Sequence, residues 1–312
     1  MMHGHVAAYR GVAVAGLLAW APALCGNQSL VSGVYGGTLG AGGATSAERS
    51  AIGQNPASLL PGRARAYAHF HSPYGMEDLQ VAEAGCSGDA AGWGLAFDWR
   101  RTGIEALYAE QVFQASQTLR LGSPGGFPGL FDLGAVWNGW RREWPGTTAM
   151  TDANGSGRNG LAWTHGFGAV WRMLPRLKAG AFVLGLPMGG GPSAGDRILQ
   201  WGIEADSRDP DVGIPESTGS PARSRTLQIL RLDFRKTGET PWRTLASLSI
   251  SPHPTVEIIG GLANPPFQAS LGIRIAYSGI RWNQSYRHHR YLGSTWLSGL
   301  DFSLPVGPAA RN

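Results

Sequence analysis

Windows in which large apolar residues alternate with small or polar ones constrain this chain more than any other feature. In AGWGLAFDWR, residues 91–100, every second residue from Trp93 to Trp99 is large and apolar, and the residues between them are Gly, Ala or Asp. Residues 267–277 repeat the alternation. Successive side chains of a strand point to opposite faces, so each window predicts a strand with one apolar and one polar face. These lengths match the roughly 9–11 residues with which a tilted strand crosses a bilayer.

Strand windows of this kind, separated by turn signals, recur along the chain. We predict them at 64–72, 78–86, 92–100, 104–114, 131–141, 161–172, 176–184, 197–205, 223–235, 242–250, 255–262, 267–277, 279–288 and 292–302. An even number near fourteen predicts an all-β fold, a single antiparallel transmembrane β-barrel in contact with outer-membrane lipids of a Gram-negative-type bacterium. The short joints at 174–176 and 251–254 predict periplasmic turns. The longer segments 121–129, 145–160, 187–196 and 206–221 predict extracellular loops.

Composition agrees with a wall that is wet on one side and apolar on the other. The chain has 47 Gly and 12 Trp in 312 residues, and only 15% of its residues are charged. The mean hydropathy of −0.12 nevertheless shows no bulk hydrophobicity. Glycine leaves room inside a barrel wall and permits its bends, while Trp suits the membrane interface. With 26 Lys and Arg against 21 Asp and Glu, and no basic run with interleaved aromatics, nucleic-acid binding is not expected.

The chain divides into four predicted parts. Residues 1–25 predict a signal peptide, with Arg10 before a short apolar stretch and cleavage after Ala23 or Cys25. Residues 26–62 predict a plug inside the lumen, in which a short helix ends before Pro56. Residues 63–304 form the barrel and residues 305–312 a tail. If Cys25 leaves with the leader, Cys86 is the only cysteine, which excludes an intramolecular disulfide and a metal site of Cys pairs.

Two patches resemble the FadL-like superfamily of outer-membrane proteins, and within it the PorV/PorQ-type barrels associated with type IX secretion. The first is GAGGATSAERSAIGQNPASL, residues 40–59, and the second is GLANPPFQASLGIRI, residues 261–275, continuing into WNQSYRHHRYLG, residues 282–293. Ahead of the Asn-Pro-Ala motif, where the family usually has acidic and aromatic residues, this chain has ERSAIGQ, residues 48–54. The resemblance implies a luminal plug whose candidate ligand or plug residues are Gly42, Gly43, Asn55, Pro56 and Ala57.

Several polar positions can be interpreted either as functional or as structural. Asn55, Pro56 and Ala57 either gate a ligand path or only turn the chain toward the first strand. His69 and His71 share a face, but two His residues without a further ligand predict polar wall positions rather than a metal site. Three charged residues with apolar neighbours are predicted to face the lumen, because a lipid-facing charge is costly: Asp132, Arg231 and Asp233.

No catalytic constellation stands out, so no enzyme and no cofactor are predicted. The best set for a nucleophile, its base and an orienting group is Ser285, His289 and Asn283, which we interpret as polar filling of the lumen. His288 and His289 point to opposite faces, and so do Glu105 and Glu110, which therefore form no general-acid pair. Nine tryptophans predict aromatic girdles: Trp137, Trp140, Trp144, Trp163, Trp171, Trp201, Trp242, Trp282 and Trp296.

Three functions remain open at this stage. The first is a FadL-like barrel that binds or passes small hydrophobic compounds across the outer membrane. The second is a PorV-like accessory or shuttle that handles proteins of a secretion system. The third is a barrel enzyme that modifies lipid through Ser285 and His289.

Overall fold

The computed structural model describes residues 43–45, 54–59, 64–73, 79–90, 93–104, 108–121, 129–143, 160–188, 197–207, 227–238, 240–290 and 293–303. Within these ranges it contains the short 3-10 helix η1 (Pro56–Ser58) and fourteen strands. The strands are β1 (Arg65–Ser72), β2 (Leu79–Ala90), β3 (Trp93–Ile104), β4 (Tyr108–Arg120), β5 (Leu130–Glu143), β6 (Gly160–Leu174), β7 (Leu177–Pro187), β8 (Ile198–Asp206), β9 (Leu227–Thr237), β10 (Arg243–His253), β11 (Val256–Asn264), β12 (Gln268–Tyr277), β13 (Ile280–His289) and β14 (Gly293–Ser303). Each corresponds to one predicted window.

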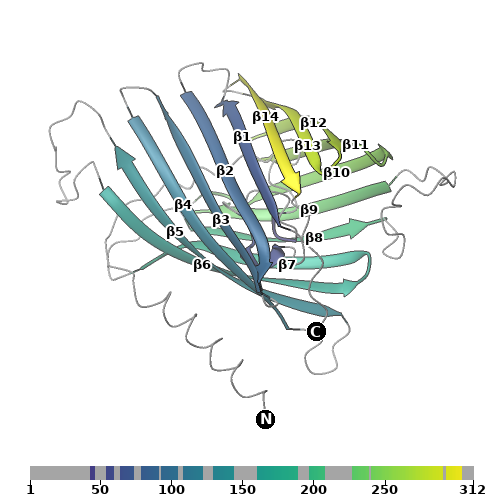
Figure 1. Ribbon diagram of the computed structural model, residues 1–312, viewed down its shortest axis with the longest axis horizontal. Coiled ribbons are helices and arrows are strands. Elements are labelled where there is room, and N and C mark those ends of the chain that lie inside the picture. The colour runs from purple at the N-terminus through teal and green to yellow at the C-terminus, as the bar shows by residue number, and fades with distance from the viewer. Residues whose placement is uncertain are drawn as a thin grey trace, which may run out of the picture.

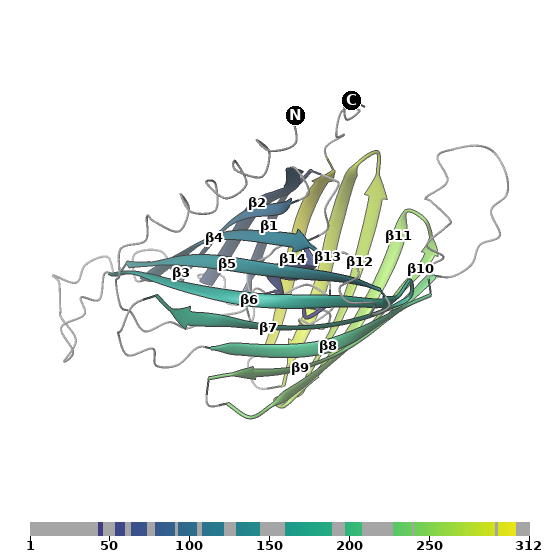
Figure 2. The same cartoon turned by 90° about the horizontal axis from the view of Figure 1, so that it is seen from below.

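The strands form one closed barrel in which all neighbouring strands are antiparallel. Neighbours are also consecutive in the chain, except that β1 pairs with β14 to close the barrel. That closing pair runs over the whole of β1, from Arg65 opposite Ser303 to Ser72 opposite Trp296. Figures 1 and 2 show the continuous wall from two directions. Closure leaves no unpaired sheet edge, which a barrel in hydrocarbon requires. The predicted single antiparallel barrel of about fourteen strands is confirmed.

Alternation along each strand separates an outer apolar wall from an inner polar one. On β3, Phe97 is 59% exposed while its neighbours Ala96 and Asp98 are 2% and 6% exposed. On β12, Leu271 is 60% exposed. Asp132, Arg231 and Asp233 are all buried and face inward, as predicted. Among the described residues, no helix is long and apolar enough to span a bilayer.

The connections differ between the two ends of the barrel. β1 begins and β14 ends at one end, and four two-residue turns join strands there, at 91–92, 175–176, 254–255 and 278–279. Short turns identify this as the periplasmic end. The prediction that all four long segments are extracellular is wrong. Segments 144–159 and 188–197 join strands at the extracellular end, but 121–129 and 207–226 join strands at the periplasmic end.

The tryptophans also divide between the two walls. Trp201, Trp242, Trp282 and Trp296 are between 41% and 58% exposed and lie on the outer wall, as expected for girdles. Trp140 is only 1% exposed and belongs to an inner apolar cluster, so its assignment to a girdle is wrong. The reason is its register: it lies an even number of residues from the inward-facing Asp132 on β5. Trp144 lies outside the described residues.

Candidate functional site

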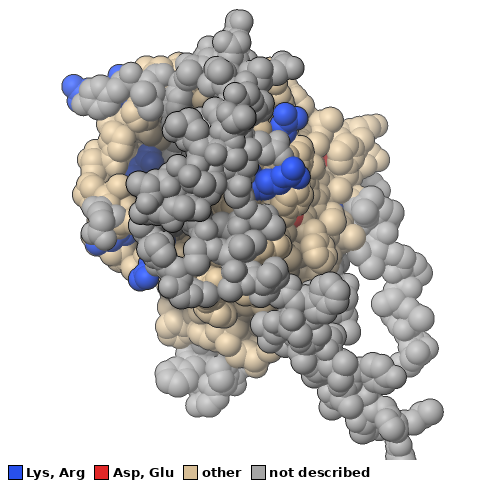
Figure 3. Space-filling model, turned by 90° about the vertical axis from the view of Figure 1, so that its left-hand side faces the viewer, with Lys and Arg blue, Asp and Glu red and all other residues tan. Residues whose placement is uncertain are grey.

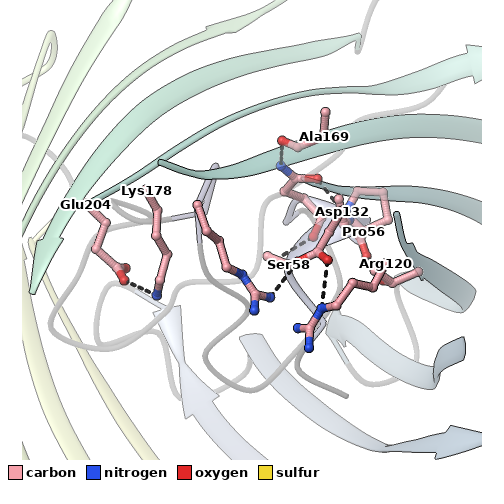
Figure 4. A network of polar contacts seen from close by, with 11 residues as sticks. Pro56, Ser58, Arg120, Asp132, Ala169, Lys178 and Glu204 are labelled. Atoms are coloured by element: carbon pink, nitrogen blue, oxygen red, sulfur yellow. Dashed lines mark hydrogen bonds and ion pairs between the residues drawn. The ribbon is translucent and has the colours of Figure 1, made fainter. Parts of the chain in front are cut away.

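Residues 43–45 and 54–59 precede β1 and lie against the inner wall; they are called the N-terminal segment. Asn55, at its centre, is 1% exposed. Its side-chain amide donates to the carbonyl oxygen of Ala44 at 2.7 Å. The same amide donates to the carbonyl oxygens of Ala169 on β6 and Ala181 on β7, at 2.8 and 3.2 Å. One side chain therefore joins both pieces of the segment to the barrel, as Figure 4 shows for Ala169.

Asn55 also caps η1, because its Oδ1 accepts a hydrogen bond from the Ala57 N–H at 3.0 Å. The predicted helix was to end before Pro56, whereas a 3-10 turn begins there. Pro fits the first position of a helix, where no N–H is needed. The Thr118 hydroxyl of β4 donates to the Pro56 carbonyl oxygen, and the Asn55 N–H donates to the Gly43 carbonyl oxygen at 2.9 Å.

Inner-wall glycines form the surface on which the segment lies. They are found where it approaches the wall most closely: Gly94 beside Leu59, Gly134 beside Pro56 and Ala57, Gly168 beside Asn55, and Gly180 beside Ala44. A Cβ atom added at Gly134, Gly168 or Gly180 would overlap atoms of the segment. Glycine is thus required at Gly134 and Gly180 by the close approach of the segment's backbone, and at Gly168 by the close approach of the Asn55 side chain.

Two groups of ion pairs lie on the periplasmic side of the segment and form the charged layer. Asp132 accepts from Arg120 Nε at 3.1 Å and pairs with an Arg172 Nη atom at 2.5 Å. Glu204 accepts from Lys178 Nζ at 2.6 Å and from Arg231 Nε at 2.9 Å. Figure 4 shows the Arg120–Asp132 and Lys178–Glu204 pairs beside Pro56 and Ser58 of the segment. Asp132 and Glu204 are each 1% exposed, so these charges depend on their partners.

The segment is bonded to carboxylates as well as to backbone. The Ala44 N–H donates to Asp233 Oδ2 at 3.2 Å, and the Thr45 hydroxyl donates to Glu204 Oε2 at 3.5 Å. Asp233 is fully buried and also accepts from Gln200 Nε2 at 2.5 Å. Residues 43–45 are thereby connected to β8 and β9, whereas Asn55 connects to β6 and β7.

An apolar layer lies on the extracellular side of the segment. Its members are buried, face inward from β4, β5, β7 and β8, and pack with Ala44: Val112, Val136, Trp140, Phe182, Leu184 and Ile198. The order of the layers can be followed along single strands. On β5, Asp132, Gly134 and Val136 face inward in turn. On β7, Lys178, Gly180 and Phe182 repeat the order of charge, glycine and apolar side chain.

The wall around the closing pair of strands contains a different polar network. His69 Nε2 lies 3.0 Å from Asp301 Oδ1, and His69 Nδ1 lies 4.0 Å from Glu83 Oε2. The Tyr67 hydroxyl donates to Asp98 Oδ1 at 2.5 Å. Asn283 donates to Asp301 Oδ2 at 3.0 Å. These contacts connect β13, β14, β1, β2 and β3 across the point where the barrel closes.

The structure brings together most of the residues that sequence predicted for the plug. Gly43, Asn55, Pro56 and Ala57 are all part of the N-terminal segment, whereas Gly42 lies outside the described residues. The sequence analysis did not predict the residues of the barrel wall that contact the segment, above all Gly134, Gly168 and Gly180. A signal existed, because DLGAV at 132–136 and KAGAF at 178–182 both place charge, glycine and apolar side chain on one face of a strand.

The set proposed for catalysis is not assembled. Ser285 and His289 both face inward from β13, as predicted, and His288 is exposed on the other face. Four residues along a strand nevertheless separate two Cα atoms by roughly 13 Å, which is too far for a nucleophile and its base. Among the described residues, no group of three or more His, Cys, Asp or Glu is arranged to hold a metal ion.

Closure, length and the apolar outer wall define this protein as an integral β-barrel of a Gram-negative-type outer membrane. No protein-family model and no curated protein sequence matches the chain. Among solved structures it is similar to the outer-membrane protein Omp33 of Acinetobacter baumannii, with a TM-score of 0.48 and 7% identity over 78% of this chain and 99% of that chain. A triple mutant of the Rhodopseudomonas blastica porin gives a TM-score of 0.38 and 9% identity over the same shares. At these values we draw neither family nor function from the similarities.

Proposed function

We propose that this barrel passes small solutes across the outer membrane and that its N-terminal segment is a plug that must shift for passage. The observation that carries the proposal is the contact between the segment and the wall glycines. Gly134, Gly168 and Gly180 leave a backbone-sized space that the segment fills. A segment held by hydrogen bonds and close packing, with no covalent link to the wall it contacts, can leave that space and return.

Small hydrophobic compounds are the solutes that the FadL-like resemblance implies, and the apolar layer supports them. Val112, Val136 and Phe182 lie on the extracellular side of the segment, where a compound from outside would arrive first. Transfer of an apolar molecule from water to such side chains is favourable by about 25 cal/mol per Å² of buried apolar surface. Passage of this kind needs no covalent step.

Mass spectrometry of organic extracts from the purified barrel tests the proposal. Full-length protein is compared with a variant that lacks residues 26–57 and with the Asn55→Ala variant, which retains the chain but loses the wall contacts of the amide. We expect apolar compounds to co-purify with the full-length protein and to be reduced in both variants. Equal extracts from all three proteins, or none from any, would contradict a ligand path controlled by the segment.

An accessory role in protein secretion is the alternative from the same resemblance. It requires a surface that binds protein cargo, and the extracellular segments expected to supply one lie outside the described residues. The described contacts favour the plugged passage, because they concern the lumen and its N-terminal segment.

A further inference from the structure

We infer that two arginines on the outer wall, near the extracellular end of the barrel, bind a phosphate group of a lipid in the outer leaflet of the membrane. They are Arg101 on β3 and Arg141 on β5, and Gln111 of β4 lies between them. These three residues are called the outer arginine row. The inference concerns the surface that faces lipid, so it does not rest on the proposed passage through the lumen.

The strand register places the outer arginine row on one line across three neighbouring strands. Arg101 is directly opposite Gln111, and Gln111 is directly opposite Arg141. Both arginines are exposed, whereas the residues just before them, Arg100 and Trp140, are each 1% exposed and face inward. Because successive side chains of a strand alternate between its faces, both arginines face outward. Their Cα atoms are separated by two strand spacings, or roughly 10 Å, so the long side chains can reach one group between them.

Aromatic side chains next to the outer arginine row indicate its depth in the membrane. One outward position closer to the periplasm, Trp99 of β3 is directly opposite Phe113 of β4. On the next two strands Gly139 is opposite Trp163, and a Cβ atom added at Gly139 would overlap the Trp163 ring. That ring therefore lies along the outer wall and covers Gly139. Aromatic girdles mark the membrane–water interface of a barrel, so the outer arginine row lies at the level of the lipid head groups.

The charge of the outer wall is concentrated at the extracellular end. Among the strand residues whose side chains the structure describes, three Lys or Arg face outward and no Asp or Glu does. They are Arg101, Arg141 and Lys236, and each lies within three residues of the extracellular end of its strand. An arginine that faces lipid is costly near the midplane of the bilayer but costs little near an interface. The outward positive charge of these strands is thus placed where it meets the head groups of one leaflet.

Phosphate is the lipid group that this arrangement fits. A planar guanidinium binds two phosphate oxygens at once, and such charge-assisted hydrogen bonds are stronger than neutral ones. The Gln111 amide carries two further donors between the arginines. A lipid whose phosphate lies at the row can cover Trp99 and Phe113 with its acyl chains, which a free phosphate ion cannot do. Figure 3 views the molecule from the side where β5 ends, and its visible described surface shows several Lys and Arg side chains but very little acidic surface.

Native mass spectrometry of the full-length protein in an uncharged detergent, titrated with diphosphoryl lipid A, tests the inference. The comparison ligand is the same lipid after enzymatic removal of its phosphates. We expect the phosphorylated lipid to bind more tightly, and Arg101→Gln to weaken its binding about tenfold, because a charged hydrogen-bond donor is lost. Arg101→Lys keeps the charge but loses the paired donors, so an intermediate affinity is expected.

The matched control is Lys236→Gln, which removes the same charge from the outer wall at the same end of the barrel. Lys236 is opposite Leu199 of β8 and lies on a different part of the wall from the outer arginine row, so the affinity is expected to stay unchanged. The inference fails if removal of the phosphates leaves binding unchanged, or if Arg101→Gln and Lys236→Gln weaken it equally. Lipid binding to the outer wall does not require the plug to move, so this failure is distinct from failure of the proposed passage.

Discussion

Inner-wall glycines occur in two settings in this barrel. On β5 to β7, the space left by Gly134, Gly168 and Gly180 is filled by the N-terminal segment. On the wall around the closing strands, the space beside Gly85 is filled by Tyr67 and Asp98, and that beside Gly299 by the His69 ring. The first setting is called the seat wall and the second the filled wall.

The difference concerns what can move. Side chains of the filled wall belong to the strands themselves, so they cannot leave without disrupting the barrel. The seat wall is completed by a segment that is separate from the sheet and attached through Asn55, Ala44 and Thr45. Under the proposed function, the same residue type marks a permanent contact on one side and a removable one on the other. The substitutions that follow test whether this distinction holds.

The largest effect is expected for Glu204→Gln in the charged layer. The change removes the negative charge between Lys178 and the nearly buried Arg231. Loss of one partner of a buried ion pair lowers the free energy of unfolding by about 3–5 kcal/mol. The temperature at which the folded barrel converts to the unfolded form on an SDS gel measures the loss. Glu257→Gln is the control, because its pair with Arg274 is more exposed and a smaller loss is expected. An equal loss in both would show that the barrel has no special dependence on the ion pairs of the charged layer.

Gly134→Val is expected to release the segment, because the new side chain would overlap the backbone of Pro56 and Ala57. Overpacking of this kind costs about 1–3 kcal/mol, which is expected to shift the segment toward the displaced state. Limited proteolysis of the segment and single-channel conductance in planar bilayers report the release.

Two further glycine variants complete that test. Gly85→Val is expected to destabilise the barrel without releasing the segment, since it meets Tyr67 and Asp98. Gly260→Val is expected to do neither, because an added Cβ there meets nothing within 4 Å. Release of the segment by Gly85→Val as readily as by Gly134→Val would abolish the distinction between seat wall and filled wall.

A smaller effect is expected for Asn55→Ala, which removes the cap of η1 and the amide contacts with Ala169 and Ala181. Loss of a cap costs about 0.5–2 kcal/mol. Here the loss is expected to reduce the free energy that holds the segment against the wall, and not the stability of the barrel. Hydrogen exchange of the segment measures it. Asn138→Ala is the control, since Asn138 is equally buried but its side chain has no hydrogen-bond partner among the described residues. Unchanged exchange in Asn55→Ala would remove Asn55 as the anchor.

Tyr67→Phe is expected to have the smallest effect on the N-terminal segment, because it removes only the hydroxyl that donates to Asp98 on the filled wall. A hydrogen bond to a carboxylate contributes about 1.5–3 kcal/mol, and here the loss falls on the barrel. Thermal unfolding measures the loss, and proteolysis of the N-terminal segment is expected to match the wild-type protein. Faster cleavage of the segment in Tyr67→Phe would show that the two walls are coupled.

Most of the fold could be predicted from the sequence, because the period of two is a property of each strand alone. Alternation at residues 91–100 gives both the strand and its outward face without knowledge of any partner. The end of the barrel at which a loop lies depends instead on whether an odd or an even number of strands precedes it in the chain. That is why 206–221 was predicted to be extracellular although β8 and β9 join at the periplasmic end.

The candidate site was predictable only in part, for a different physical reason. Asn55 and Pro56 have local roles in capping and turning that their own neighbours determine. Gly134 and Gly180 matter because a segment far away in the chain touches them. The local pattern of charge, glycine and apolar side chain does not say what fills the space beside a glycine, which at Gly85 is a neighbouring side chain. Trp140 was assigned to a girdle because residue type alone does not give the face of a strand.

The long connections are divided between the two ends of the barrel, and this division determines which of them are exposed at the cell surface. Antibodies, phages and toxic compounds reach an intact cell only from the extracellular side. They therefore act on the connections after β5 and β7, whereas the connection between β8 and β9 is sheltered from them. The sequences of the extracellular connections are therefore expected to change rapidly under selection from outside the cell. The sequences of the periplasmic connections are expected to change more slowly, because their periplasmic neighbours constrain them.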